Sequence, residues 1–219
     1  MSTQTVSRFD FVEKLPADTT VVMHDQSWED YEEVLESVGE NRGLRISYDE
    51  GTLQIMTLSP EHEKYSSLIH DLVRLVSLRL RIKVLTFGSA TMKKPRREKG
   101  LEPDDCFYVQ TADLIAGKQH IDFSTDPPPD VAVEIDIHHD SLSKFGIYAA
   151  LGVSEIWRYD EESLIIYHLE AGQYVEMPSS RAFPILSADV LSEFLGRIQR
   201  EDQYEILLAF EEWLSERQV

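Results

Sequence analysis

The chain has 219 residues, of which 42% are hydrophobic and 28% are charged, as in ordinary globular proteins. This composition excludes a disordered, collagenous or coiled-coil chain, and no apolar run approaches the ~20 residues that a membrane helix needs. Forty acidic residues against twenty-one basic ones give a net charge of −19, which argues against a protein that coats nucleic acid through its overall charge.

The amino-terminal segment lacks the basic stretch and the apolar core of a signal peptide, so we expect none. The single cysteine, Cys106, cannot form a disulfide within the chain. We therefore expect a protein of the cytoplasm, where thiols stay reduced and no membrane is a partner.

The positive charge is concentrated in one window, residues 74–99, which holds nine basic residues and one acid. A surface polarised in this way can meet a polyanion while the rest of the protein maintains solubility. For residues 74–83 the alternative is simply the solvated side of a helix. We expect the segment KKPRREK to bind nucleic acid through Lys93, Lys94, Arg96, Arg97 and Lys99.

The first part of the chain predicts a helix, a hairpin and a longer helix. A capping serine with an acid three residues on begins the first helix, and a glycine ends it. Two runs of alternating apolar residues around a turn predict the hairpin. A capping serine followed by proline begins the long helix, whose apolar residues recur at helical spacing. The ranges are 28–38, then 44–48 and 53–57, then 60–81.

The second part of the chain alternates strands and helices. The strands are predicted at 84–87, 106–109, 130–137, 155–159, 164–169 and 173–177, the helices at 140–151, 188–198 and 204–217, and a charged turn or hairpin at 91–99. This order predicts an α/β or α+β fold, in which helices cover a sheet. We divide the chain into an amino-terminal segment, residues 1–26, and one domain, residues 27–219. The helices at 188–217 pack on that domain or on a partner.

The segment Asp130-Val-Ala-Val-Glu-Ile-Asp-Ile137 carries carboxylates on a strand otherwise suited to burial. With period two, its valines and isoleucines face a core, whereas Ala132, Glu134 and Asp136 point the other way. Carboxylates are almost never fully buried unless they are paired or bound to a cation. The alternative is an edge strand with a solvated face, which the preceding prolines favour.

Two further residues can join Glu134. Asp104 follows Pro103 at the start of a strand, and if that strand neighbours Glu134 the two carboxylates converge. Two unit charges ~4 Å apart repel by about 4 kcal/mol at an effective dielectric of ~20, and Mg²⁺ removes that repulsion by binding one or two carboxylates with water and phosphate. From the next helix, the ammonium of Lys144 can return to this strand and stabilise charge on a scissile phosphate. Taken singly, Asp104 is also typical of a turn and Lys144 of a solvated helix start.

The order Pro103-Asp104, Asp130–Glu134, Lys144, Tyr148 and Gly152–Trp157 resembles the motifs of the Uma-type restriction endonuclease family, a branch of the PD-(D/E)XK nuclease superfamily. The resemblance covers about residues 27–177. It implies a restriction-endonuclease-like fold, with a mixed central sheet flanked by helices and with an amino-terminal helix and hairpin. It also implies Mg²⁺-dependent cleavage of phosphodiester bonds, with Mn²⁺ as a substitute ion.

By this resemblance Asp104 and Glu134 are metal ligands and Ile135 offers its backbone carbonyl. Lys144 takes the role of a lysine that has moved from the strand to the following helix. The usual position of that lysine, two residues after Glu134, holds Asp136. Asp136 is therefore a candidate third ligand or a water-positioning acid.

The beginning of the long helix adds weaker candidates. By the same resemblance Glu61 or Glu63 can approach the metal, and the alternative is a favourable interaction with the helix dipole. His62 is a candidate phosphate contact. The pair His138-His139 suggests a transition-metal site less well than it suggests capping and solvation, because adjacent residues of an extended segment point in different directions.

The sequence therefore predicts a Mg²⁺-dependent DNA endonuclease, and a homodimer because cutting both strands needs two centres. One alternative is a catalytically inactive binding or interaction protein on a nuclease fold, which the net charge of −19 favours. Another is an enzyme that cleaves RNA or small phosphodiesters at the same site.

Overall fold

The computed structural model describes residues 9, 11–39, 43–137 and 140–217. Their helices are α1 (Trp28–Val38), α2 (Pro60–Leu80), α3 (Ala112–Ile115), α4 (Phe145–Leu151), α5 (Ala188–Gly196) and α6 (Gln203–Glu216), with 3₁₀ turns η1 (Val12–Lys14), η2 (Pro95–Arg97), η3 (Leu142–Lys144) and η4 (Arg197–Gln199). Their strands are β1 (Thr20–Met23), β2 (Leu44–Asp49), β3 (Thr52–Thr57), β4 (Leu85–Thr86), β5 (Met92–Lys94), β6 (Lys99–Leu101), β7 (Asp105–Tyr108), β8 (Val131–Ile135), β9 (Glu155–Tyr159), β10 (Leu164–Glu170) and β11 (Gln173–Met177).

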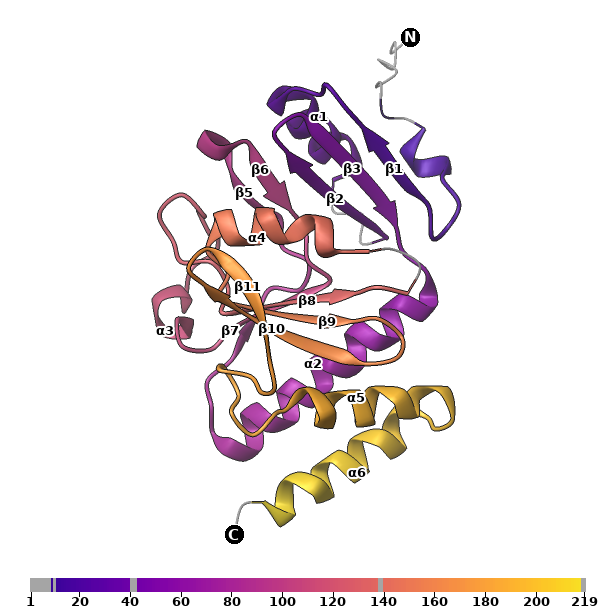
Figure 1. The fold of residues 1–219 in the computed structure, drawn as a ribbon, viewed down its shortest axis with the longest axis vertical. Coiled ribbons are helices and arrows are strands. Elements are labelled where there is room, and N and C mark those ends of the chain that lie inside the picture. Colours follow the sequence, from indigo (N-terminus) through magenta and orange to yellow (C-terminus); the bar gives the residue numbers. More distant parts are fainter. Residues whose placement is uncertain (1–8, 10, 40–42, 138–139, 218–219) are drawn as a thin grey trace.

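These strands form two sheets (Figure 1). The first sheet has five strands in the order β1-β3-β2-β6-β5, and the second has six in the order β11-β10-β9-β8-β7-β4. In the second sheet β8 and β9 run parallel, and the other neighbours are antiparallel. The predicted mixed central sheet is therefore confirmed. No helix among the described residues combines the length and apolar character that crossing a membrane requires.

Helix α1 covers the first sheet. Ser27 and Asp30 form the predicted capping box, in which each side chain accepts a hydrogen bond from the other's backbone amide. One row of side chains from β2 and β3 packs against this helix. The fully buried members of this core include Tyr31, Val34, Leu44, Ile46, Tyr48, Leu53 and Ile55. The alternation along β2 leaves Arg45 in the opposite row, away from α1.

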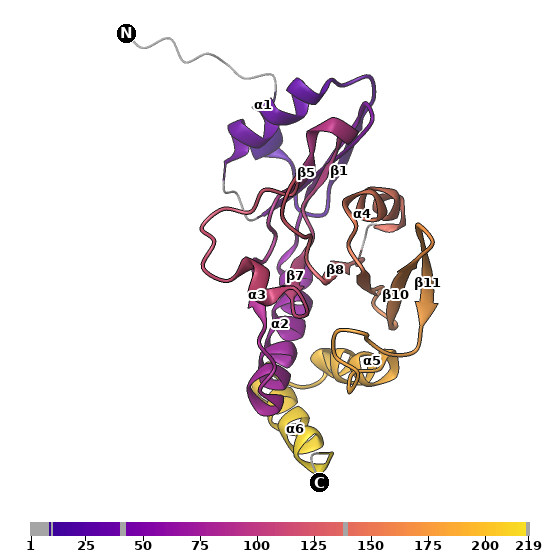
Figure 2. The same ribbon diagram turned by 90° about the vertical axis from the view of Figure 1, so that its left-hand side faces the viewer.

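The second sheet is covered on both faces (Figures 1 and 2). Val131, Val133 and Ile135 belong to the core beneath α2, α5 and α6, whereas Ala132 belongs to the core beneath α4. The two predicted faces of this strand are thus confirmed. Because β8 lies between β7 and β9, the alternative of an edge strand is wrong.

Helix α4 lies between the two sheets (Figure 2) and contacts β5, β6 and β11. The hairpin β5–β6 holds its carboxyl end: the ammonium of Lys94 donates to the carbonyl of Leu151 at 2.8 Å, and the guanidinium of Arg97 donates to that of Ala150 at 2.9 Å. Cations at this end of a helix satisfy its last carbonyls and its dipole. The hairpin of the first sheet thereby fixes a helix of the second.

The carboxyl-terminal helices pack on the same chain, where Ile206, Phe210 and Leu214 of α6 join the core that includes α2. Two details differ from the sequence-based expectation. Strand β1 and the short α3 were not predicted, and the helix expected over 140–151 begins as the 3₁₀ turn η3 before it continues as α4.

Gly100 of β6 lies against the ring of Tyr31, and a Cβ atom at this position would come within 2.8 Å of ring carbons. Tyr31 is fully buried and its ring packs against Trp28 and Tyr48, so moving it aside would disturb this packing. We expect Gly100→Ala to lower the free energy of unfolding by about 1–3 kcal/mol, the usual cost of overpacking. Urea unfolding followed by circular dichroism measures this change.

Gly196→Ala is the matched control, since among the described residues no neighbour lies within 4 Å of the added methyl and alanine favours a helix. Equal stability of the Gly100→Ala and wild-type proteins would show that α1 does not pack on β6 in this way.

Candidate functional site

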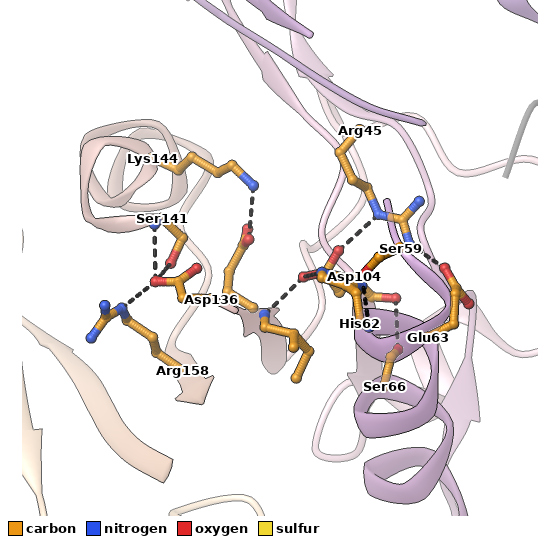
Figure 3. Close-up of polar contacts among 12 residues, drawn as sticks. Arg45, Ser59, His62, Glu63, Ser66, Asp104, Asp136, Ser141, Lys144 and Arg158 are labelled. Carbon is orange, nitrogen blue, oxygen red and sulfur yellow. Dashed lines mark hydrogen bonds and ion pairs between the residues drawn. The ribbon is translucent and has the colours of Figure 1, made fainter. Parts of the chain in front are cut away.

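Buried polar side chains from distant parts of the chain meet where the two sheets approach each other (Figure 3). They are Arg45 from β2, His62 from the first turn of α2, Asp104 from the link between β6 and β7, Glu134 from β8 and Lys144 from η3. Each of the five is at most 5% exposed. Buried charges of this kind must be paired, so their partners define the site.

Asp104 is held by groups from three elements. Its Oδ1 accepts a hydrogen bond from Nε of Arg45 at 3.0 Å, and its Oδ2 accepts one from the amide of Ile135 at 2.8 Å. Nε2 of His62 lies 2.9 Å from Oδ2, without the alignment of a hydrogen bond. Burial by itself raises the pKa of Asp104, but His62 and Arg45 outweigh burial and lower that pKa to about 2. Asp104 is therefore ionised at neutral pH.

At Glu134 the effect of burial on the pKa outweighs the effect of the neighbouring cation. Its Oε2 accepts a hydrogen bond from the ammonium of Lys144 at 2.7 Å, and its Oε1 accepts one from the hydroxyl of Tyr148. Burial, opposed by Lys144 and reinforced by the charge of Asp104, raises the pKa of Glu134 to about 7. The structure thus brings Asp104, Glu134 and Lys144 close enough for each charge to act on the other two.

Two buried carboxylates that repel each other match the donor chemistry of a hard divalent cation. Within the described part of the chain, no group of three or more His, Cys, Asp and Glu residues is arranged to hold a metal. Mg²⁺ does not require such a group, because it commonly binds one or two carboxylates and completes its shell with water and phosphate oxygens. The donor chemistry of Asp104 and Glu134 therefore suits a hard divalent cation.

Comparison with known proteins identifies the family. The family model described as "Putative restriction endonuclease", Uma2, matches residues 28–199, which is most of the chain. The chain belongs to the Uma2 family. A crystal structure described as a "putative nuclease belonging to DUF820" from Anabaena variabilis ATCC 29413 is 18% identical, with a TM-score of 0.49; the match covers 68% of this chain and 90% of that one. No curated protein matches the chain.

Membership in Uma2 confirms the resemblance inferred from the order of Asp104, Glu134 and Lys144. The family description supports the prediction that the protein is a nuclease and therefore a hydrolase.

Asp136, a candidate third ligand, is engaged elsewhere. Its Oδ2 accepts hydrogen bonds from the amide and the hydroxyl of Ser141, both at 3.0 Å, and pairs with Nε of Arg158 (Figure 3). These contacts tie the end of β8 to the turn η3. We infer that Asp136 holds Lys144 in place through this turn.

The three candidate residues at the beginning of α2 differ in their distance from the site and in their exposure. His62 is buried beside Asp104, whereas Glu61 is exposed at the surface. The side chain of Glu63 is 56% exposed and lies 3.9 Å from the guanidinium of Arg45. His138 and His139 lie outside the described residues.

Most of the basic residues expected to bind nucleic acid have partners within the protein. Lys93 pairs with Glu32 at 2.8 Å, and Lys99 pairs with Asp49 and Glu50. Lys94 and Arg97 hold the end of α4, and the side chain of Arg96 is exposed. Their contact with nucleic acid stays a prediction.

Sequence reasoning missed Arg45 and gave Tyr148 no role. Arg45 lies in the polar row of an alternating strand, where a basic residue is usually solvated, so its position gave no signal. Tyr148 lies four residues after Lys144, one helical turn on, and this spacing could have placed both on Glu134. Glu102 was also missed: it is half-buried, its carboxylate accepts hydrogen bonds from the amide of Ile46 and the hydroxyl of Thr91, and desolvation raises its pKa.

Lys144→Met removes the cation beside Glu134. At pH 8 we expect the free energy of unfolding to fall by about 3–5 kcal/mol, because a buried carboxylate loses its partner. The double variant Lys144→Met/Glu134→Gln should recover most of this loss, since glutamine carries no charge. Urea unfolding of the three variants and wild type gives the coupling energy.

Lys83→Met is the control, since the exposed pair of Lys83 with Asp113 should contribute at most about 1 kcal/mol. If the losses of unfolding free energy caused by Lys144→Met and Glu134→Gln were additive in the double variant, the pairing of Lys144 with Glu134 would be contradicted.

Glu134 should titrate near pH 7, far above the ordinary value of 4.5. Because the folded protein then holds a proton that the unfolded chain has released, stability attributable to Glu134 falls as pH rises from about 4.5 to about 7. Carbon-13 NMR of the glutamate carboxyl groups measures the midpoint, and Glu134→Gln identifies the signal. A signal of Glu134 that titrates near 4.5 would refute the coupling described here.

Proposed function

We propose that this Uma2 protein is a Mg²⁺-dependent endonuclease that hydrolyses phosphodiester bonds of DNA, with Mn²⁺ as a substitute ion. The observation that carries the proposal is the buried group of Asp104, Glu134 and Lys144, whose charges act on one another. Asp104 and Glu134 would hold the ion, together with the carbonyl of Ile135. The bound ion would supply Lewis-acid activation of a phosphodiester and of water.

The protein's own residues prepare this site. Arg45 and the amide of Ile135 orient Asp104, whose low pKa keeps it anionic at any working pH. Tyr148 fixes one oxygen of Glu134 while Lys144 holds the other. In the reaction Lys144 would stabilise the negative charge that develops on the phosphate oxygens.

The basic hairpin β5–β6 would meet the DNA backbone through the exposed side chain of Arg96, because Arg97 already donates to the carbonyl of Ala150. Lys93, Lys94 and Lys99 are half-buried and engaged within the protein, so they would contribute mainly to the local positive potential. This division would concentrate the DNA contacts of an acidic protein on a small surface.

Two observations favour a second candidate function, a nuclease-fold binding protein without turnover. Both carboxylates already have cationic partners within the chain, and the net charge of −19 opposes DNA binding in general. An RNA-cleaving enzyme would use the same residues, so substrate profiling is the comparison that separates it from the first proposal.

Purified protein should nick supercoiled plasmid in Mg²⁺ or Mn²⁺ and should stop when the ion is chelated. Glu134→Gln should lower the rate by at least ~100-fold, the usual effect of removing one preorganised electrostatic group. Glu162→Gln, an exposed acid in the turn between β9 and β10, should leave the rate unchanged. Agarose-gel quantification of the nicked form measures these rates.

Nicking that survives Glu134→Gln would point to a contaminant or to another site. If wild type does not nick, titration calorimetry with Mg²⁺ separates the remaining cases. Binding heat that wild type shows and Glu134→Gln lacks would indicate a metal-binding protein without turnover. An absence of heat in wild type would refute the metal site itself.

A further inference from the structure

Arg158 of β9 lies directly beside Glu134 in the second sheet. The two residues are partners in the register of the parallel strands β8 and β9, so their side chains point to the same face. The side chain of Arg158 is 13% exposed. A guanidinium at this position can neutralise a glutamate, yet the cation that is hydrogen-bonded to Glu134 is Lys144. Other carboxylates hold the guanidinium of Arg158.

Three aspartates surround this guanidinium. Its Nε donates a hydrogen bond to Oδ2 of Asp136, which is buried (Figure 3). Its Nη2 lies 3.8 Å from Oδ1 of Asp140, and its Nη1 lies 3.6 Å from Oδ2 of Asp160. Each nitrogen of the planar group therefore faces an acid, and this arrangement fixes the orientation of Arg158.

Two of these aspartates also bind the backbone of the turn η3, whose last residue is Lys144. Oδ2 of Asp136 accepts hydrogen bonds from the amide and the hydroxyl of Ser141, both at 3.0 Å. Oδ1 of Asp140 accepts one from the amide of Leu142 at 2.8 Å. The amide of Lys144 donates to the carbonyl of Ser141 at 2.9 Å. Both aspartates that hold the turn are thus themselves held by the guanidinium.

The contact with Asp136 is the strongest of the three, because its side chain is 5% exposed whereas those of Asp140 and Asp160 are 65% and 31% exposed. Without the guanidinium, Asp136 becomes a buried charge that has lost its cation. It regains hydration by moving outward, and its hydrogen bonds draw the turn with it. A shift of ~1 Å would lengthen the contact of 2.7 Å between Lys144 and Glu134 beyond hydrogen-bond distance.

We propose that Arg158 is a positioning residue, which fixes the ammonium of Lys144 on Glu134 through Asp136, Asp140 and the turn η3. The inference rests on the proposed function where it concerns the reaction rate, because there Lys144 stabilises charge on the phosphate. The position of the ammonium is a property of the folded chain, so it can be measured without substrate.

NMR that correlates Cε with Nζ of the lysines measures this position at pH 8, and Lys144→Met identifies the signal. Glu134→Gln supplies the reference, because it shows the shift of the ammonium without its carboxylate partner. We expect Arg158→Met to move the Lys144 signal toward that reference. Arg181→Met is the control, since it removes a guanidinium from an exposed pair with Glu170 and should leave the signal in place.

The plasmid assay with Mg²⁺ measures the effect on the reaction. Arg158→Met should lower kcat by ~10–100-fold, the usual effect of removing a group that orients a site residue. KM should stay unchanged, because Lys144 acts on charge that develops in the transition state. Arg158→Lys, which keeps a cation beside Asp136, should recover part of the rate, and Arg181→Met should match wild type.

The outcomes separate this role from the proposed function. A wild-type Lys144 signal in folded Arg158→Met refutes the positioning role, whatever the assay shows. A signal that moves while Arg158→Met nicks at the wild-type rate also refutes it, because the position of Lys144 then has no effect on the reaction. If wild type does not nick, the proposed function fails, and the NMR comparison still decides whether Arg158 positions Lys144.

Asp140→Ala keeps the test decisive if Arg158→Met does not fold. The side chain of Asp140 is 65% exposed, so its loss should cost little stability. The change removes the hydrogen bond with the amide of Leu142 and one contact of the guanidinium. The Lys144 signal should move in the same direction by a smaller amount, and an unmoved signal would overturn the proposal.

Discussion

The burial of the Asp104 carboxylate is the constraint on which the arrangement of the two sheets depends. An ionised carboxylate without partners in a protein interior costs several kcal/mol, so this residue must collect donors from whatever surrounds it. Its partners come from separate parts of the fold: Arg45 from the first sheet and the amide of Ile135 from the second donate hydrogen bonds, and the ring of His62 from α2 lies beside it. One charge therefore fixes how three elements meet, and the same contacts hold the carboxylate in a single orientation.

Helix α4 provides the second connection between the sheets. Its contacts also show that part of the basic hairpin has a structural role. In the sequence, the positive charge of residues 74–99 predicts a surface that binds a polyanion. In the structure, Lys94 and Arg97 of this window donate hydrogen bonds to the last carbonyls of α4. That helix and the turn before it carry Tyr148 and Lys144, the two partners of Glu134. Charges that hold the helix are not free to bind phosphate, so charge density along the sequence overstates the surface available to DNA.

Local sequence patterns predicted most of the helices and strands of this fold. The pairing of strands and side chains that are distant in the sequence could not be predicted in this way. The capping serines and the alternation along β2 and β8 gave correct helices, strands and faces, because these signals act within a few residues. The division into two sheets depends on which strands pair, and no local pattern encodes that choice. Asp136 is a candidate ligand because it holds the position two residues after Glu134, and only the structure shows that Ser141 and Arg158 pair with it. Arg158 and Asp136 are 22 residues apart, and the pairing of β8 with β9 brings them together.

The opposite pKa shifts of Asp104 and Glu134 indicate different duties for two carboxylates in one buried site. Asp104 remains anionic because Arg45 and His62 stay beside it, whereas Glu134 holds its charge near neutrality through Lys144. Lys144 has a single ammonium, and Glu134 is its hydrogen-bonded partner. In the proposed function, a divalent cation on the two carboxylates would relieve their repulsion and weaken the hold of Glu134 on Lys144. The ammonium would then be available to the phosphate, so the ion pair that stabilises the fold would also keep Lys144 in reserve for the substrate.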